Sequence, residues 1–474
     1  MSGFEVTRRG FLMGCSSAVA AMAGARFNSV VFGNPDGEPN QEILITIFLR
    51  GGMDALNFLP PLAGADRGYY ETARGGLQVA TNSGLQLGAS NFYLNPAASA
   101  LHDLYTNGSL AIVQGTGMFQ DTRSHFDAMS YMELGTPGSI ATDSGWITRH
   151  LRSADNLPAE IVMPSVAMGY YQPQSVAGSL ETLSLSSIGD FQLNTGPWSW
   201  RNAQRYALRE LYGSDTSAMH VSGINALNAV DIVEGNLTGT YTPAAGANYP
   251  ADSNFADHLK SVAQMIKQQL GLRSATVDLG GWDTHEGQND GSYFDNLVTE
   301  LTAGLAAFYA DLNTSQRAYT DRITVVVMSE FGRRLTANAD NGTDHGHGSI
   351  MLVLGGNVNG GLHGTWPTLA PAALFEGIDV DVTTDYRQVL SEILIRRMAN
   401  PRLGEIFPGY TGYSPLGVIQ GIDLDPIYSN IPTAVNVSDL KASTSNMAAK
   451  AATAAGIGLA ATAGLVALRN RGEM

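Results

Sequence analysis

Four short apolar runs constrain the fold of this 474-residue chain more than any other feature. They are ILITIFLRGGM (43–53), ATVDLGGW (275–282), ITVVVMS (323–329) and IMLVLGG (350–356). Apolar runs of about four to eight residues that are rich in β-branched types are typical of strands buried on both faces. Helical patterns alternate with these runs, and this order favours an α/β fold. We therefore predict a doubly wound, mostly parallel sheet with helices on both faces.

The segments between the runs carry the helical patterns. Apolar residues recur at helical spacing in 255–272 and in 294–312, so each segment predicts an amphipathic helix. The first of these helices is expected to end at Gly271. Asn95, followed by proline, predicts the capped start of another helix within 94–110.

The N-terminus predicts export from the cytoplasm. Arg8 and Arg9 precede a weakly apolar, alanine-rich stretch, and paired arginines in this position are typical of a twin-arginine signal. We expect a signal peptide over residues 1–25 and a mature protein that is periplasmic or at the cell surface. Cys15 is the only cysteine, so cleavage after Ala25 leaves neither a disulfide nor a thiolate metal site.

The rest of the chain divides into a main domain and a tail. Residues 451–468 are uncharged and barely reach the length that spans a membrane, so we expect membrane contact there, or else a soluble helix or a processed tail. The polar segment 437–450 is interpreted as a linker, which leaves a main domain over 41–435. Within it, residues 150–250 are loop-like and aromatic. They predict an inserted lid or recognition segment, with a structural excursion over the sheet as the alternative.

Composition excludes one class of partner. The chain has 44% hydrophobic and 15% charged residues, which is ordinary for a globular protein. Its formal net charge of −16 opposes binding to a nucleic-acid backbone, which needs a basic surface. We therefore expect no nucleic acid among the partners, and no feature of the sequence indicates an oligomeric state.

Acidic residues and histidines lie at the ends of the four apolar runs. In an open α/β sheet, the loops outside the carboxyl ends of the strands bring distant residues together around ligands. Carboxylate oxygens and imidazole nitrogens are ligands that suit divalent metal ions. The sequence therefore predicts a metal site. Its candidate ligands are Asp54, Asp283, His285, Glu330, His345 and His347.

Structural roles are the alternatives for these residues. Asp54, in RGGMDALN, would cap a following helix in the alternative interpretation. Asp283, in GGWDTHEG, would form an Asx turn beside an incidental histidine in the alternative interpretation. The motif DHGHG (344–348) is denser, because glycines flank each of its two histidines. A purely structural reason for that pattern is hard to find, so the motif favours a metal site.

Ser124, in DTRSHFDAM, is the candidate catalytic nucleophile. Its spacing to Asp127 resembles a capping box, so a helix cap is the alternative. A helix N-terminus also presents free amides and a positive dipole end to a phosphate or sulfate oxyanion. A serine beside a metal can lose its proton and attack such a group. Arg123 and Arg333 are the candidate substrate-binding residues, because guanidinium groups bind anions bidentately, although arginines are more often surface charges.

Six motifs in order resemble a known family. They are RGGMDALN (50–57), SHFDAM (124–129), SGWITRHL (144–151), GGWDTHEG (280–287), SEFGRR (329–334) and GTDHGHGSIMLVLGG (342–356). The set, spread over about residues 41–400, resembles the DUF1501 family of exported proteins. That family is similar to the alkaline phosphatase–sulfatase superfamily. The resemblance implies an alkaline phosphatase-like fold, usually two divalent metals, and a serine or threonine that attacks phosphate or sulfate esters.

The resemblance also implies how the candidate ligands divide between two metal sites. One site would hold Asp54, Ser124 and Glu330, and the other Asp283, His285 and one of His345 or His347. This sequence departs from the pattern at Glu330-Phe331, where the superfamily commonly has Asp-His, so one imidazole ligand is missing. His125 or the spare histidine of DHGHG is the candidate replacement. We expect one or two divalent ions, with zinc, manganese or iron as the candidates.

Two functions from different classes follow from these observations. The leading hypothesis is an exported, metal-dependent hydrolase of phosphate or sulfate esters, acting on an anionic ester or a polysaccharide-type substrate. The alternative is a non-catalytic cell-surface binding or assembly protein on the same scaffold, which the tail and the aromatic insertion favour. A calcium-stabilised structural protein is a third hypothesis, and histidine ligands argue against it because calcium takes oxygen ligands.

Overall fold

A computed structural model describes residues 42–428, with gaps at 156, 158–160, 162, 190, 192, 194–197, 238–239 and 315–317. Up to Ile427, these residues belong to one compact unit. The predicted signal peptide (1–25), linker (437–450) and membrane-contact stretch (451–468) lie outside the described residues. Within the described part of the chain, no helix has the length and apolar character that a membrane crossing requires.

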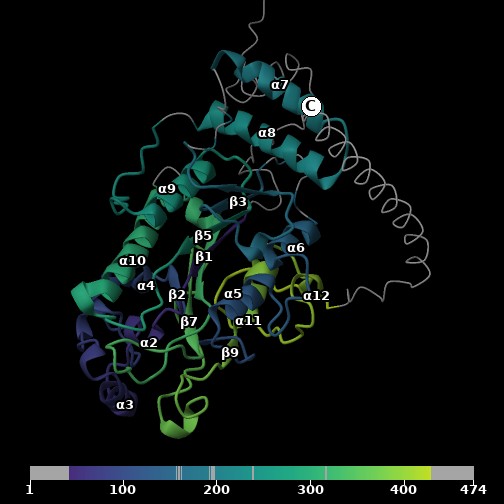
Figure 1. Ribbon diagram of the computed structural model, residues 1–474. Helices are drawn as coiled ribbons and strands as arrows, with labels where there is room; N and C mark the ends of the chain where they lie inside the picture. The colour runs from purple at the N-terminus through teal and green to yellow at the C-terminus, as the bar shows by residue number, and fades with distance from the viewer. Residues whose placement is uncertain are drawn as a thin grey trace, which may run out of the picture. The chain divides into compact units, whose positions relative to one another are not determined.

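One sheet runs through the centre of this unit (Figure 1). Its main path is β4-β3-β5-β1-β6-β7-β2-β8, and β9 pairs with β2. The middle of the path consists of β5 (Ser274–Leu279), β1 (Ile43–Leu49), β6 (Ile323–Ser329), β7 (Ser349–Leu354) and β2 (Leu110–Gly117). β7 is antiparallel to β6 and to β2, whereas the other pairings between described strands are parallel. The prediction of a mostly parallel α/β sheet is confirmed.

Short strands complete both edges of the sheet. They are β3 (Ser165–Met168) and β4 (Thr182–Leu185) at one end of the path, and β8 (Gly361–Gly364) and β9 (Thr384–Asp385) at the other. The first pair belongs to the region 150–250, which we expected to be loop-like. That region therefore extends the sheet before it continues into α7 (Arg201–Tyr212) and α8 (Ala218–Asn236).

Helices cover both faces of the sheet (Figure 1). α9 (Asn254–Lys267) and α10 (Tyr293–Leu312) pack on one face. α5 (His125–Leu134), α6 (Trp146–Ser153) and α11 (Tyr386–Arg396) lie on the other. This arrangement confirms the predicted doubly wound fold.

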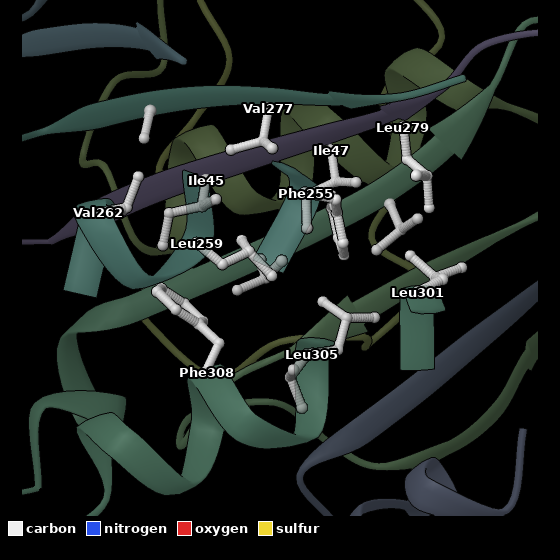
Figure 2. Close-up of a cluster of buried hydrophobic side chains, with 14 of the residues drawn as sticks. Ile45, Ile47, Phe255, Leu259, Val262, Val277, Leu279, Leu301, Leu305 and Phe308 are labelled. Atoms are coloured by element: carbon white, nitrogen blue, oxygen red, sulfur yellow. The ribbon is translucent and has the colours of Figure 1, made fainter. Parts of the chain in front are cut away.

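Alternate side chains of the central strands form the core beneath α9 and α10 (Figure 2). Ile45 and Ile47 of β1 and Val277 of β5 are buried there, together with Leu259 of α9 and Leu305 of α10. Side chains two apart in a strand, and three or four apart in a helix, share one face, so both patterns converge on this layer. Burial of each such side chain contributes roughly 1.5–3 kcal/mol.

Two predicted helices have different boundaries in the structure. Asn95 does act as a cap, since its side chain accepts a hydrogen bond from the backbone N–H of Ala97. The segment 94–110, however, forms a 3-10 helix, η3 (Pro96–Leu101), and then the short α4 (His102–Thr106). α9 ends at Lys267 rather than at Gly271, because Gln269 already adopts a left-handed φ of 56°.

The direction of β7 decides where the DHGHG motif lies. Because β7 is antiparallel to β6 and β2, its first residue pairs near the carboxyl end of β2, with Ser349 opposite Thr116. The loop before β7 therefore meets the loops that follow β1, β5, β6 and β2. These loops share the edge of the sheet where ligand sites form in open α/β folds.

Candidate metal centre

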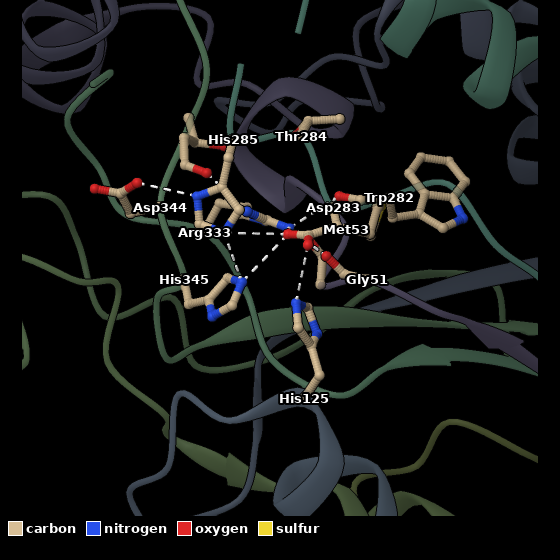
Figure 3. Close-up of polar contacts among 12 residues, drawn as sticks. Gly51, Met53, His125, Trp282, Asp283, Thr284, His285, Arg333, Asp344 and His345 are labelled. Carbon is tan, nitrogen blue, oxygen red and sulfur yellow. Dashed lines mark hydrogen bonds and ion pairs between the residues drawn. The ribbon is translucent and has the colours of Figure 1, made fainter. Parts of the chain in front are cut away.

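Asp283 lies at the centre of a cluster of three histidines (Figure 3). Its Oδ2 atom is 3.3 Å from Nε2 of His125. Its Oδ1 atom is 3.2 Å from Nε2 of His285 and 3.2 Å from Nε2 of His345, and these two nitrogens are 2.8 Å apart. His125, Asp283 and His345 each offer a ligand atom within 4.8 Å of the other two, so they form a group that could hold a metal ion.

Loops from three places in the chain deliver these side chains. His125 is the first residue of α5, Asp283 and His285 follow β5, and His345 precedes β7. The loop after β1 packs directly against the backbone of Asp283. Gly51 makes this approach possible, because its φ is 121° and a Cβ atom there would collide with the backbone nitrogen of Asp283.

An oxygen atom faces Nδ1 of each histidine in the cluster. The Nδ1 to oxygen distances are 2.9 Å from His125 to Glu330, 3.1 Å from His285 to Asp344, and 2.7 Å from His345 to the carbonyl oxygen of Arg123. Carbonyl and carboxylate oxygens only accept hydrogen bonds, so Nδ1 is the donor in each case. In a neutral ring, Nε2 then carries a lone pair, which is the state that binds a metal.

In neutral rings, the Nε2 lone pairs therefore face other acceptors. Those of His285 and His345 face each other across 2.8 Å, and that of His125 points toward the carboxylate of Asp283. His125 Nε2 is buried and has no hydrogen-bond partner among the described residues. Acceptors in such contacts repel one another unless a positive charge lies between them. Imidazole nitrogens and a carboxylate oxygen are ligands that bind zinc at about 2.0–2.2 Å, so this donor set fits a divalent cation.

The surrounding charges and burial shift the pKa values of the cluster and so affect whether its side chains can bind a cation. Burial raises the pKa of Asp283, but hydrogen bonds and the charge of Arg333 outweigh it and lower that pKa to about 2, so the carboxylate is ionised. Burial lowers the pKa of His345, which favours the neutral ring. The hydrogen bond to Glu330 raises the pKa of His125, which favours the protonated ring, so a cation at this position would have to displace that proton. Metal ligands must be deprotonated, and Asp283 and His345 meet that condition at neutral pH.

Arg333 ties together the loops that carry the cluster. Its side chain is fully buried and donates to Asp283 Oδ1 at 2.6 Å. It also donates to the carbonyl oxygens of Gly52 and Thr343, both at 2.7 Å. The guanidinium group therefore links the loops after β1 and β5 to the loop before β7. Its role in substrate binding stays a prediction, because these contacts are with other groups of the protein.

Glu330 supports His125 from the protein interior. Its fully buried carboxylate accepts hydrogen bonds from the backbone N–H of Gly51 at 2.8 Å and from Ser329 Oγ at 3.0 Å, besides the contact with His125. Glu330 does not belong to the group that converges around Asp283. Its predicted role as a ligand stays a prediction, and the contacts that it makes orient an imidazole.

Asp54 also lies outside the converging group. It caps α2 (Ala55–Phe58), because its Oδ1 atom accepts from the backbone N–H of Asn57 at 3.3 Å. Both of its oxygens pair with Arg74, the last residue of α3 (Gly64–Arg74). The helix-cap alternative therefore describes the contacts of Asp54, and its role as a metal ligand stays a prediction.

His347 and Arg123 border the cluster without joining the group. His347 is buried, and its ring stacks on Phe375 with centroids 4.0 Å apart. The guanidinium group of Arg123 pairs with Asp379 at 2.6 Å and with Glu376 at 2.8 Å. The metal role of His347 and the substrate role of Arg123 are therefore still predictions.

Ser124 caps α5 at the border of the cluster. Its Oγ atom accepts from the backbone N–H of Asp127 at 3.4 Å, which is a long contact. The carbonyl oxygen of Arg123, the residue before Ser124, accepts a hydrogen bond from Nδ1 of His345. The residue after Ser124 is His125. Ser124 therefore caps α5 and also lies next to His125 and to the residue that contacts His345.

His125 is the residue that the sequence indicated least directly. We named it only as a candidate replacement for the imidazole missing at Glu330-Phe331, yet it belongs to the converging group. Asp344, which faces His285 Nδ1, was not among the predicted ligands. The signal for His125 was its position at the start of a predicted helix, immediately after the candidate nucleophile.

The comparison with family models agrees with the motif resemblance. Residues 240–400 match the model described as "Protein of unknown function (DUF1501)". The matched range includes Asp283, His285, His345 and their supporting residue Arg333. Among curated proteins, none matches this chain.

Several solved structures are similar to this chain at low identity. A protein in the alkaline phosphatase superfamily from Vibrio parahaemolyticus is 10% identical, with a TM-score of 0.28, and the match covers 71% of this chain and 68% of that chain. The lipoteichoic acid synthase LtaP from Listeria monocytogenes is 11% identical, with a TM-score of 0.31 and coverages of 87% and 84%. The C-terminal periplasmic domain of EptC from Escherichia coli, in complex with zinc, is 9% identical, with a TM-score of 0.34 and coverages of 85% and 93%. These likenesses concern the fold alone.

Proposed function

We propose that this chain is an exported hydrolase of phosphate or sulfate esters that works with a divalent cation held by His125, Asp283 and His345. The observation that carries the proposal is the convergence of imidazole lone pairs on one ionised carboxylate. Each of these imidazoles is oriented by an oxygen at Nδ1, as is common for metal-binding histidines. When bound, the cation would bind an ester oxygen and stabilise the negative charge of the transition state.

Ser124 is the proposed nucleophile. Its hydroxyl oxygen would form a bond to phosphorus or sulfur while the bond to the leaving oxygen breaks, and the proton of the hydroxyl would end on that leaving oxygen. Water would then hydrolyse the ester formed on the serine. The N-terminus of the ten-residue α5 supports this assignment, since its free amides and dipole favour an oxyanion next to Ser124.

Turnover by Ser124 variants tests the proposed function. Because Ser124 also caps α5, we pair Ser124→Ala with Ser124→Asn, which keeps a capping side chain but removes the hydroxyl. Both variants are expected to lose about 10³-fold or more of any hydrolysis of aryl phosphates or aryl sulfates, while their metal content stays that of the wild type. Wild-type turnover in Ser124→Asn would remove the nucleophile assignment.

One observation favours the alternative of a cell-surface binding protein. Tyr170 and Tyr171, in the loop that follows β3, are 85% and 82% exposed, with ring centroids 5.1 Å apart. Exposed aromatic side chains of this kind are typical of binding surfaces. A metal-loaded wild type without turnover of either ester class, but with polysaccharide binding that Tyr170→Ala/Tyr171→Ala abolishes, would support this alternative.

A further inference from the structure

Asp54 and Arg74 form a buried ion pair near the candidate metal centre. The side chain of Asp54 is 1% exposed and that of Arg74 is fully buried. Two guanidinium nitrogens of Arg74 donate to the two carboxylate oxygens, which is the strong bidentate arrangement. The remaining donors of Arg74 contact the carbonyl oxygens of Leu335 and Arg334 at 2.7 and 3.0 Å and the side-chain oxygen of Asn57 at 3.5 Å. The charge of Asp54 is therefore neutralised within the protein.

The carboxylate of Asp54 has no lone pair left for a metal ion. Besides the two bonds from Arg74, it accepts from the backbone N–H of Asn57 at 3.3 Å and from Nε2 of Gln288 at 2.7 Å. An ionised carboxylate offers about four lone-pair sites, and these four donors fill them. A cation at Asp54 would have to displace Arg74 and leave its guanidinium group buried without a partner, which is strongly unfavourable.

Glu330, another residue implied for a second ion, is largely engaged as well, because three of its about four lone-pair sites are filled. Glu330 accepts three hydrogen bonds, from Gly51, Ser329 and His125. In the sequence, Phe331 stands where the superfamily pattern implies an imidazole. Its buried ring packs against the rings of His125 and His345, with centroid distances of 5.0 and 4.8 Å. Asp54, Glu330 and Phe331 therefore do not fit a second cation.

We infer that this centre holds one divalent cation per chain, and that the guanidinium group of Arg74 supplies the positive charge that a second cation would otherwise bring to Asp54. The inference rests on the proposed metal-binding function. Among the residues that the structure describes, one group of histidines and carboxylates converges as a metal site, and Asp54 is not part of it.

Zinc stoichiometry tests the inference on the intact protein. Apo protein would be prepared with a chelator, loaded with excess Zn²⁺ and passed through gel filtration, and the zinc per chain would be measured by elemental analysis and native mass spectrometry. One zinc per chain is expected. Two would overturn the single-cation inference and leave the metal-dependent proposal intact, whereas none would reject both.

A double variant that removes both charges of the ion pair tests whether Asp54 contributes to zinc binding. Asp54→Asn/Arg74→Gln removes both charges of the pair and leaves two amides that can bind each other. It is expected to retain one zinc with the wild-type dissociation constant, whereas Asp283→Asn, the matched loss of one carboxylate, is expected to lose the ion. Loss of zinc from the double variant in its folded state would overturn the inference. If that variant does not fold, the wild-type stoichiometry decides alone.

Discussion

His150 lies fully buried on α6, where Asn400 Nδ2 donates to its Nδ1 atom at 3.0 Å. No charged group offsets its burial, and burial lowers its pKa to about 4. His125 has the opposite surroundings, because the hydrogen bond to Glu330 raises its pKa. At the scale of single residues, burial without a charged partner and a hydrogen bond to a carboxylate therefore shift the pKa of an imidazole in opposite directions.

Acid should destabilise the fold through His150. Its pKa is about 4 when folded and about 6.5 when unfolded, so between these values the unfolded chain binds a proton that the folded chain does not. The free energy of unfolding therefore falls as the pH drops from 6.5 to 4, by roughly 3 kcal/mol from this residue. Urea titrations across this range should show a smaller loss in His150→Gln, whose amide oxygen can still accept from Asn400. Identical pH slopes in the two proteins would contradict the assignment.

Arg149 shows how one side chain joins several elements. It extends from α6 and donates to the carbonyl oxygen of Leu134 at the end of α5 and to that of Ile406 at the end of α12 (Leu403–Ile406). Burial lowers the pKa of Arg149 to about 10. Helix carboxyl ends carry partial negative charge, so they take the place of a carboxylate partner. Because α5 also carries His125, this contact anchors the helix that borders the candidate metal centre.

Removal of the Arg149 guanidinium group should loosen the ends of these helices. Arg149→Met leaves buried carbonyl oxygens without donors, and each such group costs about 1–3 kcal/mol, so we expect a loss of at least about 2 kcal/mol in the free energy of unfolding. Arg152→Met is the matched control on the same helix, because Arg152 is exposed. Denaturant unfolding of both variants measures the difference, and equal losses would count against a role for Arg149 in joining the helices.

The candidate metal centre also matters at the scale of the whole molecule. Its side chains come from loops after β2 and β5 and before β7, and hydrogen bonds through Arg333 add the loop after β1. These segments are close only in the folded chain. A cation that binds them together binds the native state and not the unfolded one, so it must stabilise the entire unit.

Zinc should therefore raise the thermal stability of the protein. At a free zinc concentration about 100 times the dissociation constant, the expected gain is roughly 2.7 kcal/mol. Thermal unfolding with and without Zn²⁺ measures this gain, and a chelator should reverse it. Asp283→Asn should show no shift. A shift of wild-type size in that variant would place the stabilising ion elsewhere.

The sequence by itself determined the strands and the loops that carry the chemistry. β1 and β6 fall within their apolar runs, and β5 and β7 each begin one residue before theirs, since burial on both faces requires apolar side chains at consecutive positions. The loop after β5 and the loop before β7 were both identified from glycines and ligand-type residues alone. Local cap signals were less reliable, as the segment 94–110 shows, because tertiary packing selects among helical forms.

Only the tertiary structure decided which of these residues meet. The antiparallel direction of β7 brings His345 to Asp283, and the approach of α5 brings His125 to Glu330, 205 residues away in the sequence. Arg74 neutralises Asp54 from 20 residues away, and no pattern in the neighbouring sequence predicts this ion pair. A carboxylate has the same sequence signal whether an arginine, a helix amide or a metal ion takes its lone pairs. The choice among them depends on which donors the folded chain places within hydrogen-bonding distance.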